Sequence, residues 1–431
     1  MHIFFSGIGG TAIGPLALIA KQAGYTVSGS DKQSSSYIDY LKHSGIDHIT
    51  IGQTLTDIKD IHSKNSIDWY VYSSAVAIEN PNSLEFKFVK EMGIKTSKRD
   101  ELINLIVKDK KLKMLAIAGT HGKTTTTAML IWLFKSLNEP LSYSVGAKIN
   151  FGEMGQYETG SKYFIYEADE FDRNFLAFEP EYSLITGVTW DHHEVFPTRE
   201  DYQEAFREFI SQTNNTIIWK EDLDYLNIEI DDKINVLDSS NEYISQIRLK
   251  GLYNRLDAYL AVTCFCELTG HSIEQAIEII NKFPGTSRRM EEISLNLYSD
   301  YAHTPEKIRG AMSVAREMAD DAKQSLAIVY EPLTNRRQHF MIDEYQDCFD
   351  GASELYIVPS YLAREDPSQR IIGPEELIGH LSDPSIAKPK LMNQDLRETI
   401  STLLKNNAMV VCLSGGGGHS LDEWIRENFK K

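Results

Sequence analysis

The residues whose types and spacing point most directly to chemistry occupy positions 119–125, with the sequence Gly-Thr-His-Gly-Lys-Thr-Thr. The apolar run 114–118 before them predicts a buried strand, and Thr124 is expected to open a helix. A tight glycine loop between a strand and a helix turns backbone N–H groups and the positive end of the helix dipole toward an anion. In such a loop Lys123 would hold the terminal phosphates of a nucleotide, and the Thr124 hydroxyl would ligate Mg²⁺. The segment therefore predicts a phosphate-binding loop; a plain glycine turn at a helix start is the simpler alternative.

Carboxylates gather at the end of the predicted strand 162–167. They are Glu167, Asp169, Glu170 and Asp172. Such a cluster is costly unless a cation or hydrogen bonds compensate it, and strand ends line the ligand crevice of an open α/β sheet. The pattern favours a Mg²⁺ role for Glu167 over a solvated loop. The next predicted strand, 182–188, leads to His192, which could complete a metal site, contact a phosphate, or simply pack in the core or on the surface.

A second nucleotide-binding pattern opens the chain. A predicted strand over 1–6 is followed by the turn Gly7-Ile-Gly9-Gly10, a helix, and a second strand that ends at Asp31. A strand–helix–strand unit with a glycine-rich turn and an acidic residue after the second strand is typical of nucleotide or dinucleotide binding. The pattern does not specify the ligand.

Two further features of the first 110 residues bear on binding. A predicted third strand, 69–73, leads to Ser74 at the same expected edge of the sheet. Arg99 begins a predicted helix, where a ligand contact and a solvated helix-start charge are equally compatible with the sequence.

Length and the alternation of strands and helices predict several α/β domains. A chain of 431 residues is long enough for two to four domains. The charged run 108–113 and the turn 284–289 are expected boundaries, which gives domains 1–110, 111–288 and 289–431. The last domain is expected to contain strands at 292–298, 326–330, 355–358 and 409–413 with helices between them, and thus another parallel sheet.

Charge and cysteine content exclude several classes of protein. The net charge of −18 argues against general binding of nucleic acid or of anionic membranes. The spacing of the four cysteines suggests neither a zinc site nor a disulfide framework. Because no signal peptide or apolar span is recognisable, a reduced cytoplasm is the expected compartment.

Several ordered motifs together resemble those of the Mur ligase family, the ATP-dependent amino-acid ligases of peptidoglycan synthesis. The motifs are 119–126, Glu167-Ala-Asp-Glu, Asp191-His192, Gly251-x-x-Asn254, Arg288-Arg289 and Asp300-Tyr-Ala-His303-x-Pro305. The N-terminal turn and Ser28-Gly-Ser-Asp31 also look like the alanine-adding branch, whose first domain holds UDP. The resemblance covers nearly the whole chain and implies a Rossmann-like N-terminal domain, a central P-loop ATPase-type domain with a mostly parallel sheet, and a Rossmann-like C-terminal domain.

The resemblance also implies an activity. A ligase of this kind joins L-alanine to the lactyl carboxylate of UDP-N-acetylmuramate through an acyl phosphate, with ATP and Mg²⁺ as cofactors, in cytoplasmic peptidoglycan precursor synthesis. UDP-N-acetylmuramate and L-alanine are then the partners, with no nucleic acid and no membrane, and the protein is expected to be a monomer or weak dimer.

Site residues follow from the matched motifs. The implied catalytic residues are Lys123, Glu167, His192 and Arg289. The implied ATP contacts are Gly119, Thr120, His121, Gly122, Lys123, Thr124, Thr125, Asn254, Arg289 and Asp300. Mg²⁺ is expected at Thr124, Glu167 and His192. The UDP-sugar is expected at Gly7, Gly9, Gly10, Asp31, Ser73 and Ser74, and the amino acid at His303 and Arg337.

Some positions depart from the family pattern and leave alternatives open. Asp257 and Gly187 stand where the family commonly has Asn, and Thr334 stands where the alanine-adding branch has Arg. The recycling ligase, which adds the L-Ala-γ-D-Glu-diaminopimelate tripeptide to the same UDP-sugar, has a similar departure at the last position. A folylpolyglutamate synthase-like ligase is disfavoured by the glycine-rich turn near the N-terminus. A non-catalytic UDP-sugar and ATP sensor is disfavoured by the retained Lys123, Glu167 and His192.

Overall fold

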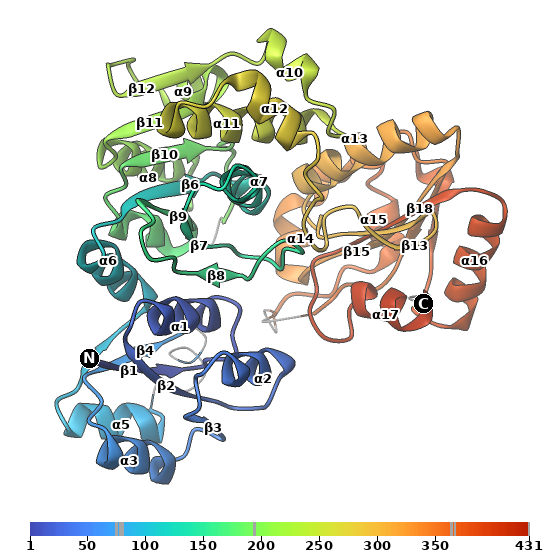
Figure 1. Ribbon diagram of the computed structural model, residues 1–431. Coiled ribbons are helices and arrows are strands. Elements are labelled where there is room, and N and C mark those ends of the chain that lie inside the picture. Colours follow the sequence, from blue (N-terminus) through green and yellow to red (C-terminus); the bar gives the residue numbers. More distant parts are fainter. Residues whose placement is uncertain (74–75, 77–81, 193–194, 363–364, 366–367, 430–431) are drawn as a thin grey trace. The chain divides into compact units, whose positions relative to one another are not determined.

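The computed structural model describes residues 1–73, 76, 82–192, 195–362, 365 and 368–429. In these residues the strands form three sheets, and helices connect them (Figure 1). The expected α/β class with mostly parallel sheets is confirmed. Contacts divide the chain into two compact units, Met1–Ile247 with Asp257–Phe283, and Arg248–Leu256 with Pro284–Lys431.

The N-terminal sheet is parallel, in the order β3-β2-β1-β4-β5. Its strands are β1 (His2–Ser6), β2 (Thr26–Asp31), β3 (Ile49–Ile51), β4 (Trp69–Tyr72) and β5 (Lys95–Ser97). Its helices are α1 (Ile13–Gln22), α2 (Ser36–His43), α3 (Leu55–Lys64), α5 (Leu84–Glu91) and α6 (Arg99–Asp109). Because the strand order reverses between β1 and β4, a crevice is expected at their carboxyl ends, where the glycine turn lies.

The central sheet has the order β12-β11-β10-β6-β9-β7-β8 and is parallel except for the β7–β8 pair. Its strands are β6 (Lys113–Ala118), β7 (Ser142–Ser144), β8 (Gly155–Gln156), β9 (Tyr163–Glu167), β10 (Tyr182–Ile185), β11 (Asn215–Trp219) and β12 (Ile234–Leu237). The helical elements around it are α7 (Lys123–Ser136), η1 (Phe171–Ala177), α8 (Arg199–Ser211), α9 (Lys220–Leu226), α10 (Glu242–Gln246), α11 (Leu252–Thr269) and α12 (Ile273–Ile280). The predicted strand 114–118 lies within β6, at the middle of the sheet, and is fully buried.

The third sheet has the order β13-β14-β18-β15-β16-β17 and is parallel except for β13–β14. Its strands are β13 (Glu291–Ser294), β14 (Leu297–Asp300), β15 (Leu326–Glu331), β16 (Glu354–Ile357), β17 (Ala387–Pro389) and β18 (Met409–Ser414). Its helical elements are α13 (Pro305–Ala322), α14 (Asn335–Met341), η2 (Ile342–Tyr345), α15 (Pro374–Ile378), η3 (Pro384–Ile386), α16 (Gln394–Lys405) and α17 (Leu421–Phe429). The single strand expected at 292–298 is wrong: the structure has a hairpin there, with Asn296 at its turn in the left-handed region (φ +63°).

One apolar core joins the two sheets of the first unit. It extends from Ile3 in β1 to Phe206 in α8, and both side chains are fully buried. Helix α1 contacts β8 so closely that a Cβ on Gly155 would lie 2.7 Å from the carbonyl oxygen of Pro15. The hydrogen bond from Asn104 Nδ2 to the carbonyl oxygen of Ala177 adds a second connection, 2.7 Å long. The N-terminal and central sheets are therefore packed against each other within the first unit.

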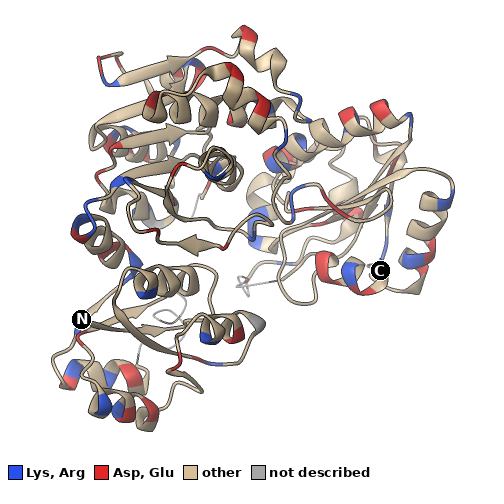
Figure 2. Ribbon diagram, viewed as in Figure 1, with Lys and Arg blue, Asp and Glu red and all other residues tan. Residues whose placement is uncertain are grey.

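Each sheet falls into one of the predicted segments 1–110, 111–288 and 289–431, although contacts separate the chain into two units. Figure 2 shows acidic and basic residues interspersed along the helices of both units. No helix among the described residues is long and apolar enough to cross a membrane.

Candidate functional site

The loop after β6 has a backbone that requires glycine at two positions. Gly119 and Gly122 both have positive φ, +142° and +76°. Gly122 caps the start of α7, and a Cβ on it would lie 2.6 Å from Oδ1 of Asp257. The N–H groups of the first turn of α7 are thus left open to an anion at a helix N-terminus.

The second residue of the loop anchors it to the central sheet. Thr120 is buried, and its hydroxyl donates to the carbonyl oxygen of Thr189 at 2.7 Å and lies 2.8 Å from the hydroxyl of Tyr202. Its N–H donates to the carbonyl oxygen of Gly187 at 2.8 Å. The Thr186 hydroxyl also donates to the carbonyl oxygen of His121. The side chain of Thr120 therefore holds the loop against the segment 187–202.

A buried ion pair lies directly under the loop. Nζ of Lys123 is 2.5 Å from Oε2 of Glu170, whose side chain is 0% exposed. Burial acts to lower the pKa of Lys123, but the carboxylates of Glu170 and Asp169 raise it above its usual value, so the ammonium stays charged. Burial also acts to raise the pKa of Glu170, and Lys123 and His192 reverse this and hold it below its usual value. Nε2 of His192 lies 3.5 Å from Oε1 of Glu170.

A second carboxylate meets the start of α7. Oγ1 of Thr124 donates to Oε1 of Glu167 at 2.8 Å, and the N–H of Gly146 donates to Oε2 at 3.0 Å. Burial raises the pKa of Glu167, against the opposing effect of Lys123 and of the Thr124 hydrogen bond. The structure thus brings Lys123, Thr124 and Glu167 together as the sequence predicts.

The donor set beside the loop fits Mg²⁺ when phosphate supplies further ligands. Among the described residues, no group of three or more His, Cys, Asp or Glu side chains could hold a metal by itself. Mg²⁺ is commonly held by one or two carboxylates together with substrate phosphates and water, and Thr124 with Glu167 offers one hydroxyl and one carboxylate. Oε1 of Glu170 is buried and accepts no hydrogen bond from the described chain. An oxygen ligand suits Mg²⁺ better than imidazole does, so His192 fits better as a neighbour of Glu170 than as a direct ligand.

The glycine turn after β1 has the expected arrangement. The N–H of Gly9 donates to Oδ2 of Asp31 at 2.8 Å, and the N–H of Gly10 donates to the carbonyl oxygen of Gly7 at 3.0 Å. A Cβ on Gly7, which has φ +78°, would lie 3.0 Å from Oγ of Ser73. The turn therefore brings these five predicted residues together; Ser74, also predicted, lies outside the described residues.

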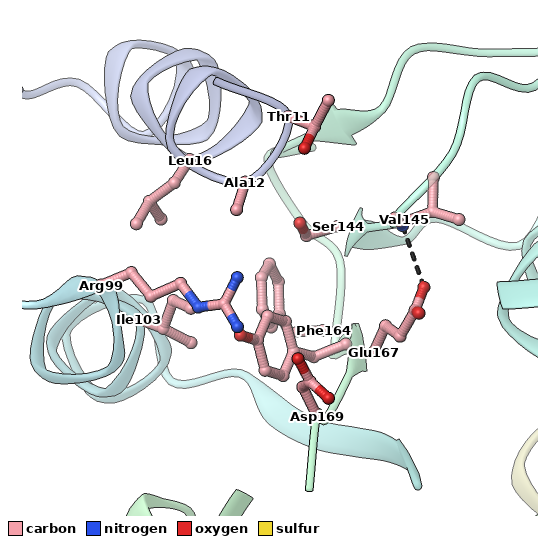
Figure 3. A pocket seen from close by; sticks show the side chains of 12 residues that line it. Thr11, Ala12, Leu16, Arg99, Ile103, Ser144, Val145, Phe164, Glu167 and Asp169 are labelled. Carbon is pink, nitrogen blue, oxygen red and sulfur yellow. Dashed lines mark hydrogen bonds between the residues drawn. The ribbon is translucent and has the colours of Figure 1, made fainter. Parts of the chain in front are cut away.

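A pocket of about 210 Å³ lies in the first unit, between the glycine turn and the central sheet. Thr11 and Ala12 line it from the turn, Arg99 from α6, and Glu167 and Asp169 from the end of β9. Figure 3 shows the guanidinium of Arg99 extending into the pocket, with the bond from the backbone of Gly146 to Glu167 dashed. The pocket thus lies between residues that directly follow the glycine turn and Glu167, the carboxylate that is hydrogen-bonded to Thr124.

The remaining predicted residues belong to the second unit. Both carboxylate oxygens of Asp300 accept backbone N–H groups, from Met290 and Ala302, each at 2.9 Å, and Nη1 of Arg289 is 4.0 Å away. Asp300 therefore shapes the turn that presents Arg289. The side chain of Asn254, in the first turn of α11, donates to the carbonyl oxygen of Lys250, which precedes the helix, at 2.8 Å.

His303 and Arg337 lie together in the second unit. Nδ1 of His303 is 2.8 Å from the carbonyl oxygen of Tyr301, and Nε2 is 3.3 Å from Nη1 of Arg337. Burial lowers the pKa of His303 well below its ordinary value, and Lys307 and Arg337 act in the same direction. A neutral imidazole that donates through Nδ1 and accepts through Nε2 satisfies both contacts. The guanidinium of Arg337 is thereby oriented at the end of β14.

Sequence reasoning missed three residues. Glu170 was part of the acidic cluster but was not assigned the contact to Lys123. Asp257 stands where the Mur ligase family commonly has Asn, and its carboxylate lies against Gly122 of the loop. For Arg99 the sequence does not distinguish a ligand contact from a solvated charge, and the structure shows that it lines the pocket. The acidic cluster was a usable signal for Glu170; the other two depend on contacts between segments far apart in the chain.

Two curated relatives are similar to the chain over most of its length. The UDP-N-acetylmuramate–L-alanine ligase of Clostridium botulinum is 32% identical over 400 residues, 84% of this chain and 84% of the relative. The protein of the same name from Caldicellulosiruptor bescii is 30% identical over 403 residues, again 84% of each. The chain belongs to the Mur ligase family.

Domain models and solved structures agree with membership of the Mur ligase family. The model of the Mur ligase family, catalytic domain, matches residues 2–111, and that of the Mur ligase middle domain matches residues 117–283. The UDP-N-acetylmuramate-alanine ligase of Thermotoga maritima superposes with a TM-score of 0.75 at 23% identity, covering 99% of this chain and 98% of that one. A murein peptide ligase from Psychrobacter arcticus superposes with a TM-score of 0.62 at 20% identity, covering 97% of this chain and 96% of that one. At these identities the structures show a shared Mur ligase fold.

Proposed function

We propose that this Mur ligase joins L-alanine to the lactyl carboxylate of UDP-N-acetylmuramate, with cleavage of ATP to ADP and phosphate. One observation carries the proposal: the pocket connects the glycine turn to the carboxylates beside the phosphate loop. A UDP-sugar on the turn would extend its carboxylate toward the terminal phosphate of ATP. The relatives named above, which carry this activity in their names, support the choice of substrates.

The reaction needs activation because a carboxylate and an amine do not condense unaided in water. Transfer of the terminal phosphoryl group of ATP to the carboxylate gives an acyl phosphate, and the amine then displaces phosphate to form the amide. Lys123 would stabilise negative charge on the phosphoryl oxygens, for which its bond to Glu170 holds it charged and in place. Thr124 and Glu167 would hold Mg²⁺, which when bound offsets the charge of the phosphates.

Each predicted segment has a role in the proposal. Residues 1–110 would bind the UDP-sugar, 111–288 would bind ATP and Mg²⁺, and 289–431, which contain Arg289 and Asp300, would contact the amino acid and a nucleotide. His303 would act through Arg337, whose guanidinium could receive the carboxylate of the amino acid. We place the reaction in the cytoplasm and expect a monomer or a weak dimer.

A recycling ligase that adds the L-Ala-γ-D-Glu-diaminopimelate tripeptide to the same UDP-sugar is the second candidate. The observation that favours it is Thr334, which replaces an expected arginine directly before α14 and has φ +53°. A smaller polar residue there leaves more room beside Arg337 for a longer amine.

The test is to incubate the protein with UDP-N-acetylmuramate, ATP and Mg²⁺ and with each amine separately, and to identify the UDP product by mass. We expect the L-alanine adduct. Lys123→Ala should lower the rate at least about 100-fold, because it removes charge stabilisation of the transferring phosphoryl group. Lys113→Ala, which removes an exposed lysine from β6, the strand before the phosphate loop, is the matched control and should leave the rate unchanged. A product only with the tripeptide would establish the second candidate, and no product with any amine would refute both.

A further inference from the structure

The pocket in the first unit has an uneven charge distribution. Two of its lining residues, Glu167 and Asp169, are carboxylates, and Arg99 is the cation that lines it. The nearby ammonium of Lys123 is already engaged by Glu170 at 2.5 Å. An anionic substrate group that enters this pocket therefore meets carboxylates, and Arg99 is the lining residue that can attract it.

Arg99 is well placed for such a contact. It is the first residue of α6, it is half-buried, and its guanidinium extends into the pocket between α1 and the end of β9 (Figure 3). Among the described residues no hydrogen bond or ion pair engages this guanidinium. A guanidinium offers paired N–H donors in the geometry that a carboxylate accepts.

The position along the pocket indicates which substrate group Arg99 meets. Thr11 and Ala12 mark the end at the glycine turn, where a diphosphate would lie. Glu167 marks the other end, and it is bonded to Thr124 of the phosphate loop. Arg99 lines the pocket together with Glu167 and Asp169, so an anionic group that reaches these carboxylates can contact its guanidinium.

We propose that Arg99 binds the reacting carboxylate of the UDP-sugar and orients it toward the transferring phosphoryl group. This inference rests on the proposed function, because it assumes an acceptor that carries both a nucleoside diphosphate and a carboxylate. The guanidinium offsets the repulsion from Glu167 and Asp169, and a carboxylate oxygen that accepts one of its N–H groups keeps a second lone pair for attack on the phosphoryl group. Arg99 is thus a substrate-specificity residue that distinguishes sugars with and without the carboxylate.

The test compares two ligands that differ in this carboxylate. Binding of UDP-N-acetylmuramate and of UDP-N-acetylglucosamine, which lacks the lactyl group, is measured by calorimetry for the wild-type protein, Arg99→Ala and Arg99→Lys. We expect Arg99→Ala to weaken binding of UDP-N-acetylmuramate about 10- to 100-fold, the effect of losing a charge-assisted hydrogen bond, and to leave binding of UDP-N-acetylglucosamine unchanged. Arg99→Lys should recover part of the loss because it keeps the charge.

Controls separate this inference from the proposed function. Lys108→Ala removes an exposed cation from the same helix, outside the pocket, and should bind both ligands like the wild-type protein. Equal weakening for both ligands would overturn the inference by assigning Arg99 to the diphosphate, and so would unchanged binding of UDP-N-acetylmuramate. In either case the wild-type protein would still form its amide product. If the wild-type protein bound neither ligand, the proposed function itself would fail.

Discussion

At the scale of single residues, the contact between Lys123 and Glu170 shows how burial decides the effect of an ion pair. The pair has an N–O distance of 2.5 Å, and its side chains are 13% and 0% exposed. Lys113 and Glu181 form a pair of almost the same length, 2.6 Å, with side chains that are 56% and 27% exposed. Solvent screens the second pair, whereas loss of one partner from the first leaves a charge buried without compensation.

Glu170→Gln should therefore destabilise the free protein by about 3 kcal/mol, because the ammonium of Lys123 would remain buried without its counter-ion. Addition of ATP and Mg²⁺ should recover part of this loss, since the phosphates supply the missing negative charge. Urea unfolding with and without nucleotide measures both effects.

The exposed pair provides the comparison for that variant. Glu181→Gln should lower the free energy of unfolding by less than about 1 kcal/mol, and ATP with Mg²⁺ should stabilise this variant as much as the wild-type protein. Equal destabilisation by the two substitutions would show that Glu170 does not compensate a buried charge in the folded protein.

At the scale of elements, the junction between β6 and α7 requires glycine for two separate reasons. Gly122 has φ +76°, and a Cβ on it would lie 2.6 Å from the carboxylate of Asp257. Gly160 has a similar φ of +89°, but a Cβ on it would have no neighbour within 4 Å. The two glycines thus separate the effect of backbone conformation from that of steric conflict.

Gly160→Ala should lower the free energy of unfolding by about 1 kcal/mol, the penalty of placing a side chain in the left-handed region. Gly122→Ala should cost more than this and should also weaken ATP binding, because the start of α7 must move away from Asp257. Thermal unfolding and nucleotide titration of both variants test the expectation. If Gly122→Ala bound ATP like the wild-type protein, the loop would not be the phosphate site.

Elements with a strong local pattern were predictable from the sequence, and contacts between distant segments were not. The strand 114–118 and the glycine turn near the N-terminus were found because apolar runs and glycine spacing are local signals. The hairpin at 291–300 was missed because the left-handed turn at Asn296 interrupts an otherwise uniform strand pattern. The hydrogen bond between the hydroxyls of Thr120 and Tyr202 could not be predicted, because these residues lie 82 positions apart in the chain.

At the scale of the whole molecule, the two compact units have separate apolar cores. One core of the first unit includes Ile218 of β11, and one of the second includes Ile328 of β15; both side chains are 0% exposed. Four of the five tryptophans belong to the first unit, and Trp424 belongs to the second. Tryptophan fluorescence therefore reports mainly on the first unit, whereas far-ultraviolet circular dichroism reports on both.

We expect urea unfolding to show two transitions that the two signals weight differently. Ile218→Ala should shift the transition that dominates fluorescence, and Ile328→Ala should shift the other, each by the roughly 2–5 kcal/mol that follows loss of a buried isoleucine side chain. ADP with Mg²⁺ should raise the urea midpoint of the transition that dominates fluorescence, because the phosphate loop and its carboxylates lie wholly within the first unit. If both substitutions and the nucleotide moved one coincident transition equally, the two units would unfold as a single cooperative body.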